Sequence, residues 1–309
     1  MTKYISFRGT FEKVPRTLQI FKSNFMNKVR IITDSASDLP KRFLTEHEIR
    51  VVPMRTLFAD GEYVDGVTIT PSQFYEKLIE SDDFPTTSQP SPMEFTEVYR
   101  EVREAGDTAV IITLSSKLSG TYQSAQIALE GFEDCIFLVD SLNAAMGEGA
   151  LVERAVQLRG MGLTASEIAE TLETDRVRLR LIALLDTLEY LKKGGRISKA
   201  AAFAGGLLSI KPVVAVEDGE VKLLGKARGS KQGNNMLNRL VGETGGVDFS
   251  LPIRLGYSGL SDTLLRKYIE DSRELWHYDR SDLSVDIVGS TIGTHAGPGA
   301  IAVAFFSKE

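Results

Sequence analysis

The chain has 309 residues, of which 42% are hydrophobic and 25% charged, and its formal net charge is −6. This length exceeds what one hydrophobic core usually serves, so we expect two domains. The acidic balance argues against nucleic acid as a partner, no apolar run is long enough to span a bilayer, and the single cysteine, Cys135, excludes an internal disulfide. These features predict a cytoplasmic globular protein with at most transient membrane contact.

Residues 1–27 differ from the rest of the chain because five of their six charged side chains are basic and they show no clean hydrophobic period. We expect them to form a poorly ordered extension that precedes the first domain. A basic arm at a membrane surface is the alternative, but the segment lacks a sustained amphipathic stripe.

Strand and helix patterns alternate over residues 28–175, which we predict to form the first domain. Helix starts are marked by the capping box Thr70–Gln73, by Pro92 and by the capping box Thr164–Glu167, and Asp38 is expected to cap an earlier short helix. The expected strands are 29–33, 51–58, 62–64, 108–114 and 135–140, and the expected helices are 38–47, 71–81, 92–104, 120–130, 144–160 and 165–173. Repeated βα alternation predicts a mostly parallel, three-layer α/β/α domain.

Residues 176–309 follow a different pattern, with a hairpin signal at Asp218-Gly219. The expected strands are 180–185, 210–216, 221–227, 253–257, 284–290 and 300–306, and the expected helices are 188–193, 230–244 and 261–273. Hairpins mixed with helices predict a second, mixed-sheet α/β domain that begins near residue 176.

Two adjacent hydroxyls, Ser115 and Ser116, follow the apolar run of the strand that ends at residue 114. Ligands of open α/β sheets bind at the carboxyl ends of parallel strands, and hydroxyls beside a helix start suit a carboxylate or a phosphate. Serines at such junctions also serve simply as caps or turn residues.

Further polar residues gather at four other points of the chain. Thr87 and Ser88 lie in a loop rich in hydroxyls, and Asp34 and Ser35 follow the first strand. Turn formation and helix capping are the plain explanations for both segments.

Arg196 follows the break Gly194-Gly195 and could bind a carboxylate or phosphate through two parallel hydrogen bonds. His295 precedes Gly297 and Gly299 and could donate a hydrogen bond or a proton. A lone histidine is more often structural. Basic residues exceed acidic ones between residues 192 and 231, which indicates either an anionic partner or a solvated face.

Several common chemistries have no matching motif in the sequence. The chain has no Walker A motif, no complete dinucleotide fingerprint, no G-x-S-x-G elbow and no metal-ligand spacing, so we expect no metal and no cofactor. Nothing in the sequence pairs a nucleophile with a base.

Taken together and in order, these clusters resemble the DegV family over residues 28–309. The matching segments are residues 33–39, 87–91, 115–122, 194–197 and 295–299. Ala296 departs from the family pattern, where threonine is common. The resemblance implies a bacterial protein that binds one long-chain fatty acid between two domains. It also implies that the protein presents the carboxylate to a separate ATP-dependent kinase, the catalytic subunit of fatty acid kinase, whose acyl phosphate product feeds phospholipid synthesis.

The same resemblance implies roles for individual residues. The fatty-acid carboxylate is expected to meet Thr87, Ser88, Ser115, Ser116, Arg196 and His295. The supporting loops are expected to contain Asp34, Ser35, Ser119, Gly120, Gly297 and Gly299. Residues 203–208 are candidates for contact with the hydrocarbon tail, although ordinary core packing is the favoured role for each of them.

Two functions remain open on this basis. The first is a lipid-binding, substrate-presenting subunit that is not itself an enzyme and has no catalytic residues. The second is a hydrolase or phosphatase acting on an acyl ester or acyl phosphate, with Ser115 or Ser116 as nucleophile and His295 as base. Such an enzyme needs serine and histidine about 3 Å apart.

Overall fold

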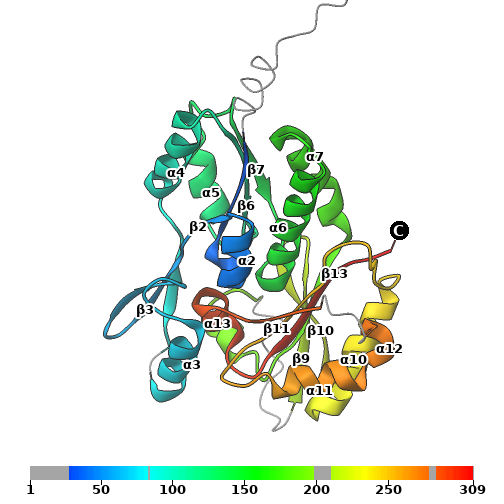
Figure 1. Ribbon diagram of the computed structural model, residues 1–309. Coiled ribbons are helices and arrows are strands. Elements are labelled where there is room, and N and C mark those ends of the chain that lie inside the picture. The colour runs from blue at the N-terminus through cyan, green and yellow to red at the C-terminus, as the bar shows by residue number, and fades with distance from the viewer. Residues whose placement is uncertain (1–27, 83, 198–209, 278–282, 309) are drawn as a thin grey trace, which may run out of the picture.

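The computed structural model describes residues 28–82, 84–197, 210–277 and 283–308. Their strands form three sheets (Figure 1). Every strand before residue 175 belongs to the four-stranded or the three-stranded sheet, and every described strand after it belongs to the six-stranded sheet. The partition into domains of residues 28–175 and 176–309 stays a prediction, and residues 1–27 lie outside the described part of the chain.

The first sheet is parallel, with the strand order β2-β1-β6-β7. Its strands are β1 (Val29–Asp34), β2 (Arg50–Val52), β6 (Thr108–Thr113) and β7 (Ile136–Asp140). The helices around it are α2 (Lys41–Glu46), α4 (Pro92–Glu104), α5 (Thr121–Ala128), α6 (Ala145–Gly160) and α7 (Ala165–Asp175). This arrangement confirms the predicted mostly parallel α/β/α domain.

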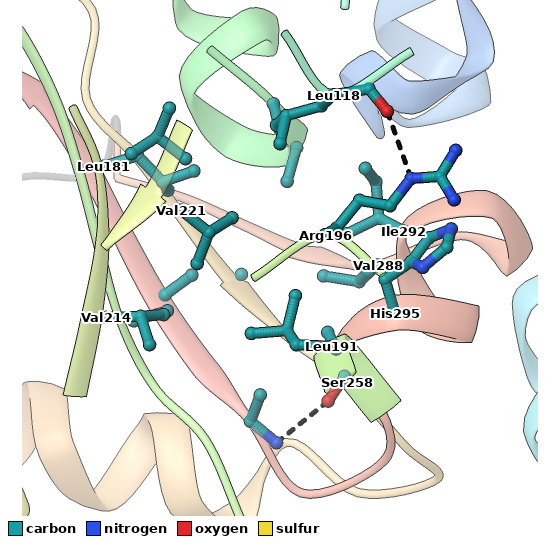
Figure 2. A pocket seen from close by; sticks show the side chains of 18 of the residues that line it. Leu118, Leu181, Leu191, Arg196, Val214, Val221, Ser258, Val288, Ile292 and His295 are labelled. Carbon is teal, nitrogen blue, oxygen red and sulfur yellow. Dashed lines mark hydrogen bonds between the residues drawn. The ribbon is translucent and has the colours of Figure 1, made fainter. Parts of the chain in front are cut away.

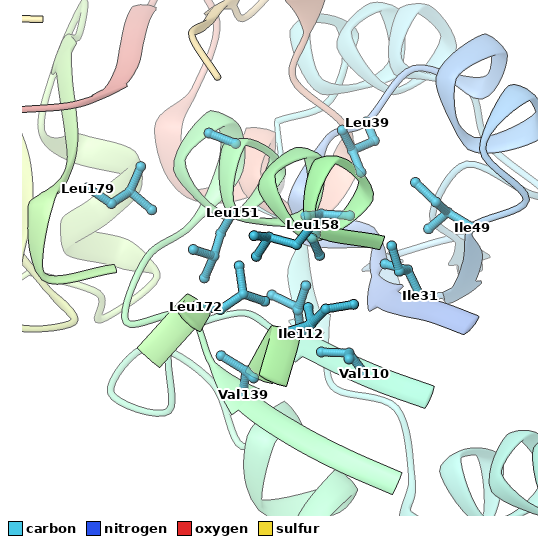
Figure 3. Close-up of a cluster of buried hydrophobic side chains, with 14 of the residues drawn as sticks. Ile31, Leu39, Ile49, Val110, Ile112, Val139, Leu151, Leu158, Leu172 and Leu179 are labelled. Carbon is cyan, nitrogen blue, oxygen red and sulfur yellow. The ribbon is translucent and has the colours of Figure 1, made fainter. Parts of the chain in front are cut away.

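Side-chain alternation along the strands explains why helices cover both faces of this sheet. Ile31 and Ile112 point to the face covered by α6 and α7, in the cluster shown in Figure 3. Their neighbours Ile32 and Ile111 point to the opposite face, which α4 and α5 cover. A strand that is buried on both sides has no polar face, so its sequence is a continuous β-branched run.

The second sheet is mixed, with the order β10-β9-β8-β13-β11-β12, and β11 and β12 form its parallel pair. Its strands are β8 (Leu179–Leu184), β9 (Ile210–Glu217), β10 (Glu220–Arg228), β11 (Arg254–Tyr257), β12 (Ser284–Ile287) and β13 (Ile301–Phe306). The helices α10 (Gly229–Glu243), α11 (Thr263–Asp271) and α12 (Arg273–Trp276) cover one face. The expected hairpin at Asp218-Gly219 joins β9 to β10.

Helix α6 connects the two halves of the chain because it packs against β1 and β6 of the first sheet and also against β8, β11 and β13 of the second. Its residues from Ala145 to Val152 are all buried, as expected for a helix with sheets on both sides. Gly149 permits this fit, since a side chain there would collide with the carbonyl oxygen of Ser37.

The third sheet is a small antiparallel one with the order β4-β3-β5, next to α3 (Pro71–Glu80). Its strands are β3 (Arg55–Phe58), β4 (Gly61–Val64) and β5 (Thr86–Ser88). This unit packs against α13 (Ser290–Ala296), and α13 also contacts α8 (Glu189–Lys193). Two short 3₁₀ helices, η1 (Ser35–Ser37) and η2 (Arg176–Arg178), complete the described elements.

Both predicted capping boxes are present, and Ser91 with Glu94 forms a third at the start of α4. Three expectations about element boundaries were wrong. The expected strand 51–58 is two strands in different sheets, separated at Pro53 and Met54. Asp38 does not cap a helix start; it ends η1 in the left-handed region at φ 50°, and α2 begins at Lys41 after Pro40.

The third wrong expectation concerns the end of the strand predicted at 284–290. The strand β12 ends at Ile287, and Ser290 begins the helix α13, which the sequence did not predict. No helix among the described residues combines the length and apolar character that crossing a membrane requires.

Candidate functional site

A cavity of about 120 Å³ lies between the two halves of the chain. It lies between the second sheet, helix α13 and the loops that follow β6 and β7, at the carboxyl ends of those parallel strands. Most of its lining is aliphatic, including Leu118, Leu181, Leu191, Val214 and Val221 (Figure 2). Such a lining suits a long apolar ligand.

Polar side chains of the lining gather where α13, α8 and β5 meet. His295 on α13 places Nε2 2.9 Å from Oγ1 of Thr87 on β5. Arg196, just after α8, lies beside His295 in Figure 2. Ser119, in the loop before α5, belongs to the same lining, and its Oγ lies 2.9 Å from Oγ1 of Thr121. These four residues form what we call the polar end of the cavity.

The Arg196 side chain is held by main-chain carbonyls from two segments. Its Nε donates to Leu118 O at 3.1 Å, and its Nη1 donates to Gly194 O at 2.7 Å. The first of these bonds joins the loop after β6 to the segment after α8. A guanidinium fixed in this way carries a permanent charge into the polar end.

His295 is mostly buried, and burial lowers its pKa to about 4, with a smaller contribution from the charge of Arg196. The imidazole is therefore neutral at physiological pH. Its Nδ1 is buried and has no hydrogen-bond partner among the described residues. Gly194 explains how the ring fits, since a Cβ at that position would collide with Nδ1.

The predicted serine pair lies next to the cavity but not in its lining. Ser115 is fully buried, and its Oγ donates to Gly219 O at 2.8 Å, at the tip of the β9–β10 hairpin. The backbone N–H of Ser116 donates to the carboxylate of Asp140 at 3.1 Å. Ser88, which was also expected to meet the carboxylate, is absent from the lining, because successive residues of a strand point to opposite faces and Thr87 faces the cavity.

Of the residues assigned to supporting loops, Asp34 and Ser35 connect strand ends. The Asp34 carboxylate accepts from Ala36 N and Leu114 N, both at 2.8 Å, so it holds the loop after β6 to the end of β1. Burial raises the pKa of Asp34 to about 7. The Ser35 hydroxyl accepts from Met54 N at 3.0 Å.

The supporting glycines provide close packing around the polar end. A side chain at Gly120 would collide with Gln89, and one at Gly297, where φ is +68°, would collide with the ring of Tyr190. Gly299 N donates to Ser258 O at 2.8 Å. Ser119, assigned with this group, is the one member that lines the cavity.

Ser258 and the aliphatic residues of the lining were not predicted from the sequence. The Ser258 hydroxyl donates to Gly297 O at 2.6 Å and accepts from Ala300 N at 2.8 Å, which shapes the backbone around the cavity. No sequence signal marks these residues, because an aliphatic side chain at a cavity wall resembles one in a core. Residues 203–208, suggested for the tail, lie outside the described residues.

A second, more polar groove adjoins the cavity from outside. The two share Leu118, Arg196 and Val221, and the groove is also lined by Lys117 and Lys222. Arg196 therefore lies at the boundary between the polar end and this groove, whose other charged residues are Lys117, Lys222 and Glu220. In the described ranges no group of three or more His, Cys, Asp or Glu side chains is arranged to hold a metal ion.

Comparison with known proteins gives a consistent result. The family described as uncharacterised protein, DegV family, matches residues 28–308. A DegV domain-containing protein of Caldanaerobacter subterraneus subsp. tengcongensis is 37% identical over 288 residues, which cover 92% of this chain and 100% of that protein. One from Deinococcus radiodurans is 34% identical over 281 residues, covering 89% and 97%.

Solved structures agree with these sequence matches. A fatty-acid-binding DegV family protein from Thermus thermophilus matches with a TM-score of 0.82 and 34% identity, over 91% of this chain and 100% of that chain. DegV from Bacillus subtilis, a fatty acid binding protein, matches with a TM-score of 0.79 and 28% identity, over 92% and 100%.

Proposed function

Because this chain belongs to the DegV family, and because its cavity is aliphatic with hydrogen-bond donors gathered at one end, we propose that it binds one long-chain fatty acid between its two halves. The carboxylate would lie at the polar end, against Thr87, Ser119, Arg196 and His295. The hydrocarbon tail would extend along the aliphatic walls. Relatives described as fatty-acid-binding support this ligand class.

The separation of apolar walls from polar end is the observation that carries the proposal. Each buried CH₂ group contributes about 0.8 kcal/mol, so the tail would supply most of the affinity. A carboxylate removed from water needs several donors, and the polar end offers hydroxyls, an imidazole and a guanidinium. The donors would thus fix which way round the ligand lies.

We further propose that the protein presents the bound carboxylate to a separate ATP-dependent kinase, which forms an acyl phosphate for phospholipid synthesis. The polar groove that contains Lys117 and Lys222 supports this, because Arg196 lines both this groove and the cavity. A partner could approach the carboxylate from the groove while the hydrocarbon tail stays inside the cavity. In this role the chain is a cytoplasmic substrate carrier, and the partner performs the chemistry.

The alternative of a serine hydrolase or phosphatase is less well supported. The Ser115 hydroxyl is engaged with Gly219, and His295 Nε2 lies against Thr87 instead of a serine. The buried Nδ1 of His295 lacks a partner in the described part of the chain, so no third residue there orients the imidazole as a base. Binding without catalysis is therefore the preferred function.

Native mass spectrometry of the purified protein, beside a denaturing lipid extract, tests the ligand. We expect close to one fatty acid per chain; a protein that stays empty after incubation with fatty acids would refute the proposal. Acyl phosphate formation then requires both ATP and a fatty acid kinase catalytic subunit. Turnover of an acyl substrate without either, lost in His295→Ala, would favour the hydrolase.

A further inference from the structure

Helix α13 contributes to both parts of the cavity. Its residues Thr291, Ile292 and Ala296 line the wall, and His295 belongs to the polar end. The helix lies in the second half of the chain, between β12 and β13. Its position therefore determines where the imidazole stands relative to Thr87, which comes from the first half.

Two buried aspartate side chains from the first half hold the beginning of this helix. Asp65, which follows β4, accepts from Ser290 N at 3.0 Å and Ser290 Oγ at 2.7 Å through Oδ1, and from Thr291 N at 3.3 Å through Oδ2. Asp38 accepts from Gly289 N at 2.8 Å. Both aspartates are less than a tenth exposed. The first N–H groups of α13 thus have acceptors that lie 225 or more residues away in the sequence.

The far end of α13 contacts the small β4-β3-β5 sheet through His295 and Thr87. Together with contacts at the start of the helix, this contact forms a closed ring. Thr56 of β3 pairs with Thr87 of β5, and its hydroxyl donates to Ser290 Oγ at 2.9 Å. Asp65 is tied to the segment before β3 by its own N–H, which donates to Met54 O at 3.0 Å. From Thr87 the ring returns to α13 through His295. Each link fixes the helix against the sheet that carries Thr87.

Asp65 is the link with the most bonds to the helix. Helix N-terminal N–H groups have no partner within the helix, and a buried donor left unsatisfied costs about 1–3 kcal/mol. An asparagine at position 65 would keep one acceptor oxygen but turn an NH₂ group toward donors. The N-terminal turn of α13 would then have to move to regain partners.

We propose that Asp65 is a positioning residue: through α13 it holds His295 against Thr87, and so sets the geometry that receives the fatty-acid carboxylate. The part of this inference that concerns ligand rests on the proposed function. The part that concerns His295 does not, because the imidazole can be observed in the protein without ligand.

The first test measures the pKa of His295 in the unliganded protein by NMR titration of the imidazole. The chain has three histidines, and the signal is assigned by its loss in His295→Gln. In Asp65→Asn we expect the pKa to rise from about 4 towards the unperturbed value of about 6.5, because the displaced ring is better hydrated. Loss of the negative charge alone would lower this pKa, so a rise reports movement of the ring.

The second test compares palmitic acid with hexadecanol, which has the same tail but no carboxylate. We expect Asp65→Asn to weaken binding of the acid about tenfold, equivalent to ~1.4 kcal/mol, and binding of the alcohol by less than about twofold. Asp60→Asn is the matched control, because Asp60 is exposed in the nearby β3–β4 turn and pairs with Lys77. It should change neither the pKa of His295 nor either affinity.

The outcomes separate the two proposals. A folded Asp65→Asn protein whose His295 pKa equals that of the wild type would overturn the positioning role. Equal weakening of acid and alcohol would also overturn it, because Asp65 would then support the cavity as a whole. If Asp65→Asn does not fold, Thr56→Val removes another link of the ring and should shift the pKa in the same direction. A wild-type protein that binds no fatty acid would instead contradict the proposed function and leave the NMR result intact.

Discussion

Oγ1 of Thr87 lies 2.9 Å from Nε2 of His295, although 208 residues separate them in the chain. Thr87 belongs to the small antiparallel sheet and His295 to a helix of the second half. Their contact marks the end of the cavity at which Arg196 and Ser119 also lie. Donors drawn from four separate segments meet at this point.

The serines of the loop after β6 are predicted to have different roles. Ser119→Ala should weaken palmitic acid binding about fivefold to tenfold, which corresponds to the ~1 kcal/mol of one hydrogen bond. Ser116→Ala should change the affinity by less than about twofold, because Ser116 does not line the cavity. Isothermal titration of each variant distinguishes them. A larger effect at Ser116 than at Ser119 would restore the ligand role that the sequence suggested for the serine pair.

Ser115→Ala provides the comparison within the same loop. It removes the bond from Ser115 Oγ to Gly219 O and should lower the free energy of unfolding by about 1 kcal/mol. Its effect on affinity should remain smaller than that of Ser119→Ala.

Much of the fold could be predicted because its signals are local. The capping boxes that begin at Thr70 and Thr164 lie within four residues each, and the helices start where these patterns predict. The parallel sheet follows from β-branched runs with helices between them. The break at Pro53 also had a local signal, since proline interrupts strands, but the apolar residues on both sides suggested one continuous strand.

Helix α13 could not be predicted because what stabilises it is not local. Its seven residues include β-branched side chains and a glycine, which disfavour a helix, and no residue next to it caps its start. Asp65 supplies that cap from the other half of the chain. The direction of Ser115 depends likewise on Gly219, which only the folded hairpin brings into reach. Residue types and strand ends were therefore predictable, whereas the side chains that face the cavity were not.

The lowered pKa of His295 predicts that the free energy of unfolding depends on pH. Its pKa is about 4 in the folded protein and about 6.5 when unfolded, so between these values the unfolded state binds more protons. The wild type should therefore lose about 2.6 kcal/mol relative to His295→Gln as the pH falls from about 6.5 to 4. Urea unfolding of both proteins across this range measures the difference.

Asp34 changes the free energy of unfolding with pH in the opposite direction, but this contribution cancels when the wild type is compared with His295→Gln. Its pKa is raised to about 7, so the folded state keeps a proton that the unfolded state loses, and stability falls as the pH rises from about 4 to 7. Both proteins share this contribution. A constant difference between the wild type and His295→Gln would show that the imidazole is not held in a buried, neutral state.

Arg254 is predicted to hold the two halves together. Its side chain is 1% exposed and pairs with Glu153 of α6 at 2.8 Å and with Asp286 of β12. Arg254→Met leaves a buried carboxylate without its partner and should destabilise the protein by about 3–5 kcal/mol. Arg239→Met, which removes an exposed pair with Glu243, should cost less than about 0.5 kcal/mol. Similar urea midpoints for the two variants would contradict this role.

Gly194 offers the sharpest test of the packing around the imidazole. Its φ is −73°, which any residue can adopt, so a substitution there is opposed by contacts of the Cβ: it would collide with Nδ1 and Cε1 of His295 and lie 3.2 Å from Tyr190 O. Gly194→Ala should push the ring away from Thr87, weaken palmitic acid about tenfold and lower the free energy of unfolding by about 1–3 kcal/mol.

Gly160→Ala is the matched control, because Gly160 ends α6 with nothing within 4 Å of a Cβ. Alanine is the better helix former, so this variant should be more stable than the wild type by about 0.5–1 kcal/mol, with unchanged affinity. If Gly194→Ala instead binds palmitic acid like Gly160→Ala, the ring of His295 can move without loss of the ligand. The imidazole would then not be one of the groups that hold the carboxylate, and the donors at the polar end would reduce to Thr87, Ser119 and Arg196.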